Sequence, residues 1–226
     1  MKKKYLKTLT FILLAHINQA IAQEPYEKFN RDVESFNASI DATILKPITE
    51  SYVSITADPI RTTVSNFVDN LTYPVTIIND VLQGKIEQGI QDSARFIFNT
   101  TFGLFGLIDI ATPMGLEAHD EDFGQTFAVW GWSDSDYLNL PLLGPSSVRD
   151  ATGKPFSLIM TNYGIPFTLA RTLSVREKIM PIDPMIDAAP DRYVFIRDAY
   201  QQQRDFLIND GKSKSTDKFK GFDFSE

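Results

Sequence analysis

The densest group of side chains that could do acid–base chemistry is a run of four consecutive residues: His119, Asp120, Glu121 and Asp122. A histidine beside carboxylates could act as a general base whose ring is oriented by an acid. Four consecutive side chains cannot all point at one substrate, because neighbouring side chains leave the backbone in different directions. We therefore interpret the run as a solvated surface loop and keep catalysis by His119 as the alternative.

Other chemical signatures are missing from the sequence. Asp134 and Asp136 lack the further ligands and the glycine of an EF-hand calcium loop, so we interpret them as part of a surface turn. The chain has no nucleophile elbow, zinc-binding HExxH, P-loop or dinucleotide-binding glycine motif. It has no cysteine and two histidines. We therefore expect no catalytic residue, no metal and no cofactor, and the protein is predicted not to be an enzyme. A net charge of −7 argues against nucleic acid as a partner.

The first residues have the pattern of a secretory signal peptide. A lysine-rich start precedes a short apolar stretch, and Ala20, Ile21 and Ala22 form an A-x-A cleavage site before Gln23. We predict that residues 1–22 are removed and that the protein is exported. No later stretch approaches the ~18 uninterrupted apolar residues typical of a spanning helix.

Apolar residues at steps of three and four predict helices in the first half of the chain, over residues 26–46, 58–71, 73–84 and 85–99. Pro47 is expected to end or kink the first helix. The stripe of the fourth helix contains Ile86, Ile90 and Ile97. An amphipathic stripe faces a protein core more often than a membrane, so burial is the expectation and membrane contact is the alternative.

The middle of the chain carries an apolar segment with two glycines, residues 101–111. It is too rich in glycine for a good helix and too apolar for a solvated loop. Two interpretations remain open from the residues alone: a buried core loop, or a segment presented to lipid.

The remaining elements are assigned from caps and prolines. We expect a short helix over 123–130, an extended stretch over 137–145, and a helix capped by Ser146 or Ser147. A stripe that includes Phe167 ends before Pro181, and Asp191 begins a final helix that ends at Gly211. Residues 23–211 are predicted to form a single, mainly α domain, and the polar residues 212–226 a disordered tail.

Short motifs along the chain, taken in order, resemble those of the MlaA (VacJ) family of outer-membrane phospholipid-transport proteins. Any one of them is weakly specific, but the ordered set extends from about Pro25 to Gly211. The matching stretches are residues 29–31, 36–37, 66–67, 70–71, 73–74, 79, 82–85, 95–101, 103–111, 123–126, 130–131, 137–138, 140–142, 144–146, 149–150, 197–200 and 203–204.

The resemblance implies a ring-like arrangement of amphipathic helices around a lipid channel, in the inner leaflet of a Gram-negative outer membrane. Phospholipid would leave the outer leaflet, pass to a soluble periplasmic carrier and reach an inner-membrane ABC transporter complex, with a porin trimer as neighbour. This process would maintain outer-membrane lipid asymmetry. In the family, an apolar hairpin-like segment influences lipid passage. The matching residues for lipid passage or membrane contact are Phe102, Gly103, Leu104, Phe105, Gly106, Leu107, Ile108 and Ile110.

One feature departs from the family pattern. Members usually carry a lipidated cysteine at the end of the signal peptide, whereas this chain has an A-x-A site and no cysteine. We therefore expect the protein on the periplasmic side of the outer membrane without a lipid anchor, or in the periplasm. The favoured hypothesis is non-enzymatic lipid transport. The alternatives are a soluble periplasmic scaffold that keeps the fold without transport, and a lipid hydrolase that uses His119.

Overall fold

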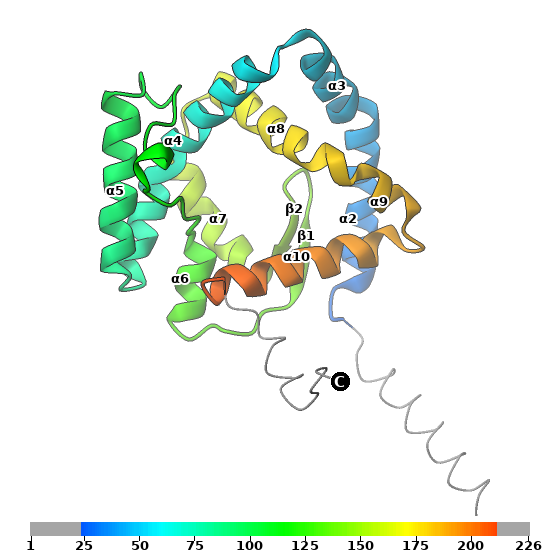
Figure 1. The fold of residues 1–226 in the computed structure, drawn as a ribbon. Coiled ribbons are helices and arrows are strands. Elements are labelled where there is room, and N and C mark those ends of the chain that lie inside the picture. Colours follow the sequence, from blue (N-terminus) through cyan, green and yellow to red (C-terminus); the bar gives the residue numbers. More distant parts are fainter. Residues whose placement is uncertain (1–23, 212–226) are drawn as a thin grey trace, which may run out of the picture.

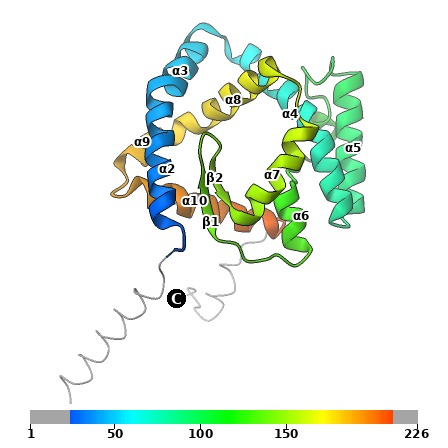
Figure 2. The same ribbon diagram turned by 180° about the vertical axis from the view of Figure 1, so that it is seen from behind.

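The structure is a computed structural model that describes residues 24–211. The predicted signal peptide with its cleavage residues Ala20, Ala22 and Gln23, and the predicted tail 212–226, lie outside the described residues. Helices follow one another around a ring, and a small hairpin projects toward the centre of the ring (Figures 1 and 2). The prediction of a mainly α fold is confirmed.

The first half of the ring consists of long helices. A π-helical turn joins the first two of them, and a tight turn at Gly84 separates the last two. In chain order the elements are α2 (Glu27–Ile40), the π turn (Asp41–Leu45), α3 (Lys46–Ile55), α4 (Asp58–Leu82) and α5 (Ile86–Thr101).

The second half contains shorter elements and the hairpin. Ser147 and Asp191 cap α7 and α10 by accepting hydrogen bonds from the backbone N–H groups of Asp150 and Val194. The elements are a 3₁₀ turn (Thr112–Met114), α6 (Phe123–Val129), β1 (Tyr137–Leu140), β2 (Gly144–Ser147), α7 (Val148–Met160), α8 (Ile165–Ile179), a second 3₁₀ turn (Met180–Ile182), α9 (Asp183–Ala188) and α10 (Arg192–Ile208).

Two prolines do not break the helical segments where the sequence predicts a break. Pro74 lies inside α4, so the two predicted helices over 58–71 and 73–84 are one. Pro47 lies in the first turn of α3, directly after the π turn, where Lys46 N–H donates to the Asp41 carbonyl. A π turn widens the hydrogen-bond spacing, so the backbone tolerates the missing N–H of Pro47 there.

The stretch over 137–145 is extended, as predicted, but it also turns back and pairs with itself. β1 and β2 are antiparallel, with Tyr137 opposite Ser147 and Leu140 opposite Gly144. The turn between them places Leu142 at φ 65°, a left-handed conformation that usually requires glycine. The Asn37 side chain holds this turn: its Nδ2 donates to the Leu140 carbonyl at 3.0 Å, and its Oδ1 accepts from Leu142 N–H at 2.8 Å.

The burial pattern is inverted relative to that of an ordinary soluble domain. More polar and charged residues than apolar ones are buried in the part of the chain that the structure describes. Large apolar side chains are exposed on every long helix. A soluble protein normally buries its large aliphatic side chains and exposes its charged ones.

Helix α5 shows the inversion most clearly. Its buried residues are Gly89, Asp92, Arg95 and Asn99. The apolar stripe is exposed instead, with Ile90 at 66%. The expectation that this stripe faces the core is therefore wrong. The periodicity identified the helix correctly, but the polar stripe provides the contact with the rest of the protein.

Candidate functional site

The predicted lipid-contact segment forms an exposed loop at the end of α5, and we call residues 102–110 the apolar loop. Phe105 is 70% exposed and Phe102 is 65% exposed, while Gly103 and Gly106 are buried. Leu104, Leu107 and Ile108 are also exposed, and Ile110 is half-buried. The structure thus brings the predicted residues together with most of their apolar side chains exposed, which favours an outward-facing segment over the buried core loop.

The backbone of the apolar loop is hydrogen-bonded on its inner side. Phe105 N–H donates to the Thr100 carbonyl at 2.9 Å, and Gly106 N–H donates to the Asn99 carbonyl at 2.8 Å. The Asn99 side-chain oxygen accepts from the N–H groups of Ile110 and Ala111 at 2.9 and 3.0 Å. With these polar groups satisfied, the loop can face an apolar phase at little cost in unpaired hydrogen bonds.

The two glycines of the loop allow this close turn. A Cβ at Gly103 would lie 2.2 Å from the Ile108 carbonyl oxygen. Gly106 has φ 90°, and a Cβ there would lie 2.4 Å from the Asn70 Cβ. Leu104 and Phe105 adopt φ 54° and 60° without being glycines. These two left-handed residues strain the backbone, and both carry exposed apolar side chains.

A buried cation, Arg95, anchors the loop to the ring. Its guanidinium donates to Asp109 at 3.1 Å and to the Tyr73 hydroxyl at 2.8 Å, and it also binds the Leu116 carbonyl. Burial raises the pKa of Tyr73 to about 12. Burial also disfavours the charged form of Asp109, but hydrogen bonds from Thr112 and Asn99 and the charge of Arg95 lower its pKa overall.

The apolar loop continues into the exposed stripe of α5. This helix lies on the outside of the ring, packed on α4 (Figure 1). Ile86, Ile90 and Ile97 project from α5 on the same side, because residues four and seven apart share a face. An apolar surface of this kind marks a protein or membrane contact. In residues 24–211, no helix combines the length and apolar character needed to cross a membrane.

A second polar cluster joins α6, α7 and α10 within the ring. Arg204 donates to Asp122 at 2.6 Å and to Asp150 at 2.9 Å, and Tyr200 binds the other oxygen of Asp150. Gly124 leaves room for this pairing, since a Cβ there would lie 2.1 Å from the Asp150 Oδ1. Burial raises the pKa of Asp150, but Arg204, Tyr200 and Arg149 lower it below its ordinary value.

Two further cations lie near the Arg204 cluster. Lys154 on α7 and Arg171 on α8 form no ion pair or side-chain hydrogen bond within the described residues. Burial lowers the pKa of Lys154, the charges of Asp122 and Asp150 raise it, and those of Arg204 and Arg171 lower it. Lys154 therefore lies close to the charged groups of the Arg204 cluster and to Arg171 of α8.

The predicted acid–base run is only partly a solvated loop. Glu117 and Asp120 are exposed, but Glu121 is buried and binds Lys85 at 2.8 Å, which corrects the surface-loop interpretation at that residue. His119 binds Asp92 of α5 at 3.0 Å instead of its chain neighbours. Asp134 and Asp136 are exposed.

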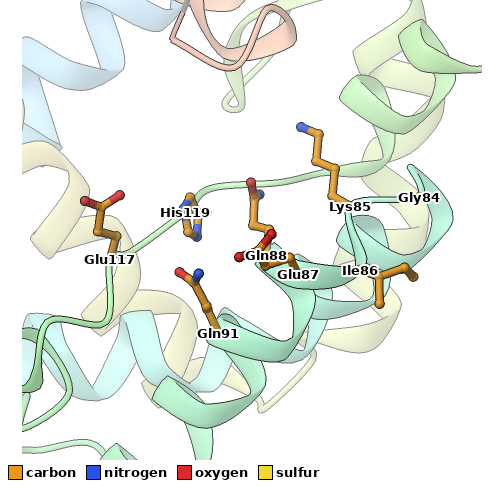
Figure 3. Close-up of a pocket in the computed structure, with 8 residues that line it drawn as sticks. All are labelled: Gly84, Lys85, Ile86, Glu87, Gln88, Gln91, Glu117 and His119. Carbon is orange, nitrogen blue, oxygen red and sulfur yellow. The ribbon is translucent and has the colours of Figure 1, made fainter.

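A polar pocket of about 530 Å³ lies between α5 and this segment (Figure 3). His119 lies opposite Gln88 and Gln91, whereas the carboxylate of Glu117 points away from them (Figure 3). The lining contains no serine, threonine or cysteine that His119 could activate as a nucleophile. In residues 24–211 no three histidine or acidic side chains are arranged to hold a metal ion.

Sequence reasoning missed several residues that the structure brings together: Arg95 with Asp109, Arg204 with Asp122 and Asp150, and Asp80 with Asp92. Asp80, Asp92, Arg95, Asp150 and Arg204 are helical and lie on buried faces, whereas Asp109 lies in the apolar loop and Asp122 is the N-cap of α6. A polar stripe with as regular a period as the apolar one is the signal that could have found the helical ones.

A ring of helices that buries polar side chains and exposes apolar ones defines a class of proteins with an inverted burial pattern. The family model described as MlaA lipoprotein matches residues 22–207, and the chain belongs to the MlaA family.

Named relatives and a solved structure agree with this assignment. The chain is 30% identical over 202 residues to the intermembrane phospholipid transport system lipoprotein MlaA of Escherichia coli, covering 84% of this chain and 80% of that protein. It is 35% identical over 199 residues to an uncharacterized protein of Rickettsia typhi, covering 82% and 78%. A structure from work on the maintenance of bacterial outer membrane lipid asymmetry superposes with a TM-score of 0.72 at 28% identity, covering 83% of this chain and all of the other.

Proposed function

We propose that this protein transports phospholipid from the outer leaflet of the outer membrane to a soluble periplasmic carrier, without covalent chemistry. The observation that carries the proposal is the inverted burial pattern: polar stripes form the contacts within the ring, and the α5 stripe and the apolar loop project outward. Such a ring suits an environment in which the outside is hydrocarbon and the inside is polar.

In this proposal the exposed apolar side chains hold the protein in the inner leaflet. Removing apolar area from water stabilises by about 25 cal/mol per Å², so several helix faces together can exceed the marginal binding of a single acyl chain. The 226 residues contain no cysteine to carry such a chain. A negatively charged protein is repelled by anionic headgroups, so the attachment would be apolar and insensitive to salt.

The polar interior supplies the path for the headgroup. A phospholipid that crosses a leaflet must bring its charged phosphate past hydrocarbon, which is the main barrier to the movement. Lys154 and Arg171, which form no ion pair with residues 24–211, and the Arg204 cluster offer that phosphate charged partners on three elements of the ring. The tails would follow the apolar loop. A porin trimer would hold the ring in place, and the carrier would pass lipid to the inner-membrane ABC transporter.

The test combines membrane fractionation with detection of bound lipid. Phe105→Asp and Leu107→Asp place a charge in the proposed hydrocarbon contact, which costs ~2.5–3.5 kcal/mol at mid-depth and less near the interface. Ser35→Asp adds the same charge at an exposed polar position of α2 and serves as the matched control. We expect wild type and Ser35→Asp to stay with the outer membrane through a high-salt wash, to leave it in detergent, and to carry phospholipid in native mass spectrometry.

The two loop variants should fold, as judged by circular dichroism, but lose membrane retention and lipid clearance from the outer leaflet. Recovery of wild type in the soluble periplasmic fraction without lipid would refute the proposal and favour a scaffold. Unfolding of both loop variants would show that the loop packs as a core.

A further inference from the structure

Asp80 of α4 and Asp92 of α5 are both fully buried, with no exposed surface. Gly89 brings the two helices together here: a Cβ at this position would lie 3.2 Å from the Asp80 Cβ and 3.9 Å from its Oδ2. Asp92 follows Gly89 by three residues and therefore lies one turn further along the same face of α5. The two acidic side chains are within hydrogen-bonding reach of one another inside the α4–α5 contact.

Each carboxylate has one oxygen with a donor and one without. Gln88 Nε2 donates to Asp80 Oδ1 at 2.7 Å, and His119 Nδ1 lies 3.0 Å from Asp92 Oδ2. Asp80 Oδ2 and Asp92 Oδ1 are buried and find no donor within the described residues. A buried carboxylate oxygen without a donor is costly, and two negative charges in contact are more costly still. A single proton between these two oxygens would remove both costs.

The surroundings add negative charge more than they relieve it. The 117–121 segment contributes Glu121, which forms an ion pair with Lys85. Lys85 also binds Asp210, just after α10, so its single positive charge is shared between two carboxylates. α5 contributes Arg95, which is committed to Asp109, and α6 contributes the neutral Thr126 hydroxyl, which donates to Asn79. Burial and the neighbouring Asp92 raise the pKa of Asp80 to about 7, and burial raises the pKa of Asp92.

We propose that Asp80 and Asp92 share one proton, and that this proton holds α4, α5 and the 117–121 segment together as a pH-sensitive clamp. With the proton present, the O–H of one carboxyl group donates to the other carboxylate, and Asp92 stays bound to His119. When the proton leaves to solvent, the two charges repel and the contact loosens. Gln88 and His119, which bind the two carboxyl groups, also line the polar pocket (Figure 3).

The experiment measures the NMR chemical shifts of the aspartate side-chain carboxyl carbons as a function of pH, in protein with isotope-labelled aspartate. The first measurement is made on the wild type. We expect one buried carboxyl group of the wild type to titrate near neutral pH. In Asp80→Asn, whose amide imitates the protonated acid, this titration should vanish. The control Asp32→Asn removes an exposed acid and should leave it in place. If every aspartate titrates in the ordinary acidic range, the shared proton is refuted.

Hydrogen exchange tests the clamp. Protection in the α4–α5 contact and at the start of α6 should fall several-fold in the wild type as pH rises through about 7, after correction for the intrinsic exchange rate. Asp80→Asn should keep its protection across this range. Equal pH dependence in wild type and Asp80→Asn would refute the clamp even if the proton is shared. Neither readout depends on lipid transport.

Discussion

The ring has two contrasting sides. At the α5 corner, buried polar groups anchor apolar side chains that face outward, and the Arg95 side chain is itself buried. On the opposite side, α2 and α3 meet α8–α10 through many ion pairs that are partly exposed, such as Arg31 with Asp191 at 2.9 Å and Arg192 with Glu34 at 2.9 Å. The buried ion pair at the corner therefore stabilises the fold at any salt concentration. The ion pairs on the far side contribute less and weaken as salt is added, because solvent and ions screen exposed pairs far more than buried ones.

The largest effect should come from the anchor of the corner. Arg95→Ala removes the cation that pairs with Asp109, and it leaves the Tyr73 hydroxyl and the Leu116 carbonyl without the guanidinium donor. Breaking a buried pair by removing one partner costs about 3–5 kcal/mol. Chemical unfolding should show this loss, whereas Phe105→Ala, at an exposed position of the same loop, should change stability by less than about 0.5 kcal/mol. Similar losses for both would contradict the view that the corner is held by its polar side.

A methyl group at Gly103 should have the next largest effect. Its Cβ would collide with the carbonyl oxygens of Ile108 and Asn99, which are backbone atoms and cannot move alone. We expect Gly103→Ala to destabilise by about 1–3 kcal/mol, in the range of other overpacked sites. Gly115→Ala provides the control, because no atom lies within 4 Å of its Cβ, although its φ of 81° adds some strain. A Gly103→Ala protein as stable as Gly115→Ala would refute the close turn.

The free energy of unfolding should depend on pH in opposite directions for two kinds of buried carboxyl group, those with a lowered pKa and those with a raised one. Asp109 and Asp150 have lowered pKa values in the folded state. Their contribution is therefore present above the unfolded pKa near 3.8 and is lost as pH falls through the folded value. Asp80 has the opposite sign: its raised pKa favours the folded state at low pH, and this gain is lost between about 4 and 7.

We expect Asp109→Asn to be less stable than wild type at neutral pH and to approach it in acid. Asp80→Asn should be more stable than wild type above neutral pH and converge with it in acid. Thermal unfolding across pH measures both differences. If stability relative to wild type depended on pH in the same way in both variants, the opposite pKa shifts of Asp109 and Asp80 would be refuted.

The smallest effect is expected on the far side of the ring. Arg31→Ala removes ion pairs with Glu27 and Asp191 that are about two-fifths exposed. Exposed pairs contribute about 0.2–1 kcal/mol, and salt screens them. The loss should shrink when urea unfolding is repeated at high salt, while that of Arg95→Ala should not. A salt-independent loss at Arg31 would point to its stacking on Tyr193 at 4.5 Å instead.

The sequence predicts the helices well but not which way they face. Periodicity and caps place α5, α7 and α10 correctly, because Gly84, Ser147 and Asp191 are local signals. An apolar stripe has the same period whether it meets a core or a membrane, so the outward orientation of Ile90 could not be read from it. The continuous helix through Pro74 and the turn at Leu142 could not be predicted, because a local sequence pattern does not show which distant residues contact a segment.

Two asparagines of α2 set the position of the hairpin along the helix. Asn30 donates to the Tyr137 carbonyl and accepts from Asn139 N–H, and Asn37 does the same for Leu140 and Leu142. Each side-chain amide thus takes the place that a neighbouring strand's peptide group would occupy. Seven residues of helix rise about 10.5 Å, and three residues of strand span about 10 Å, so the two scales coincide at this spacing. A hairpin displaced by one residue would lose both amides at once, which fixes its register without a third strand.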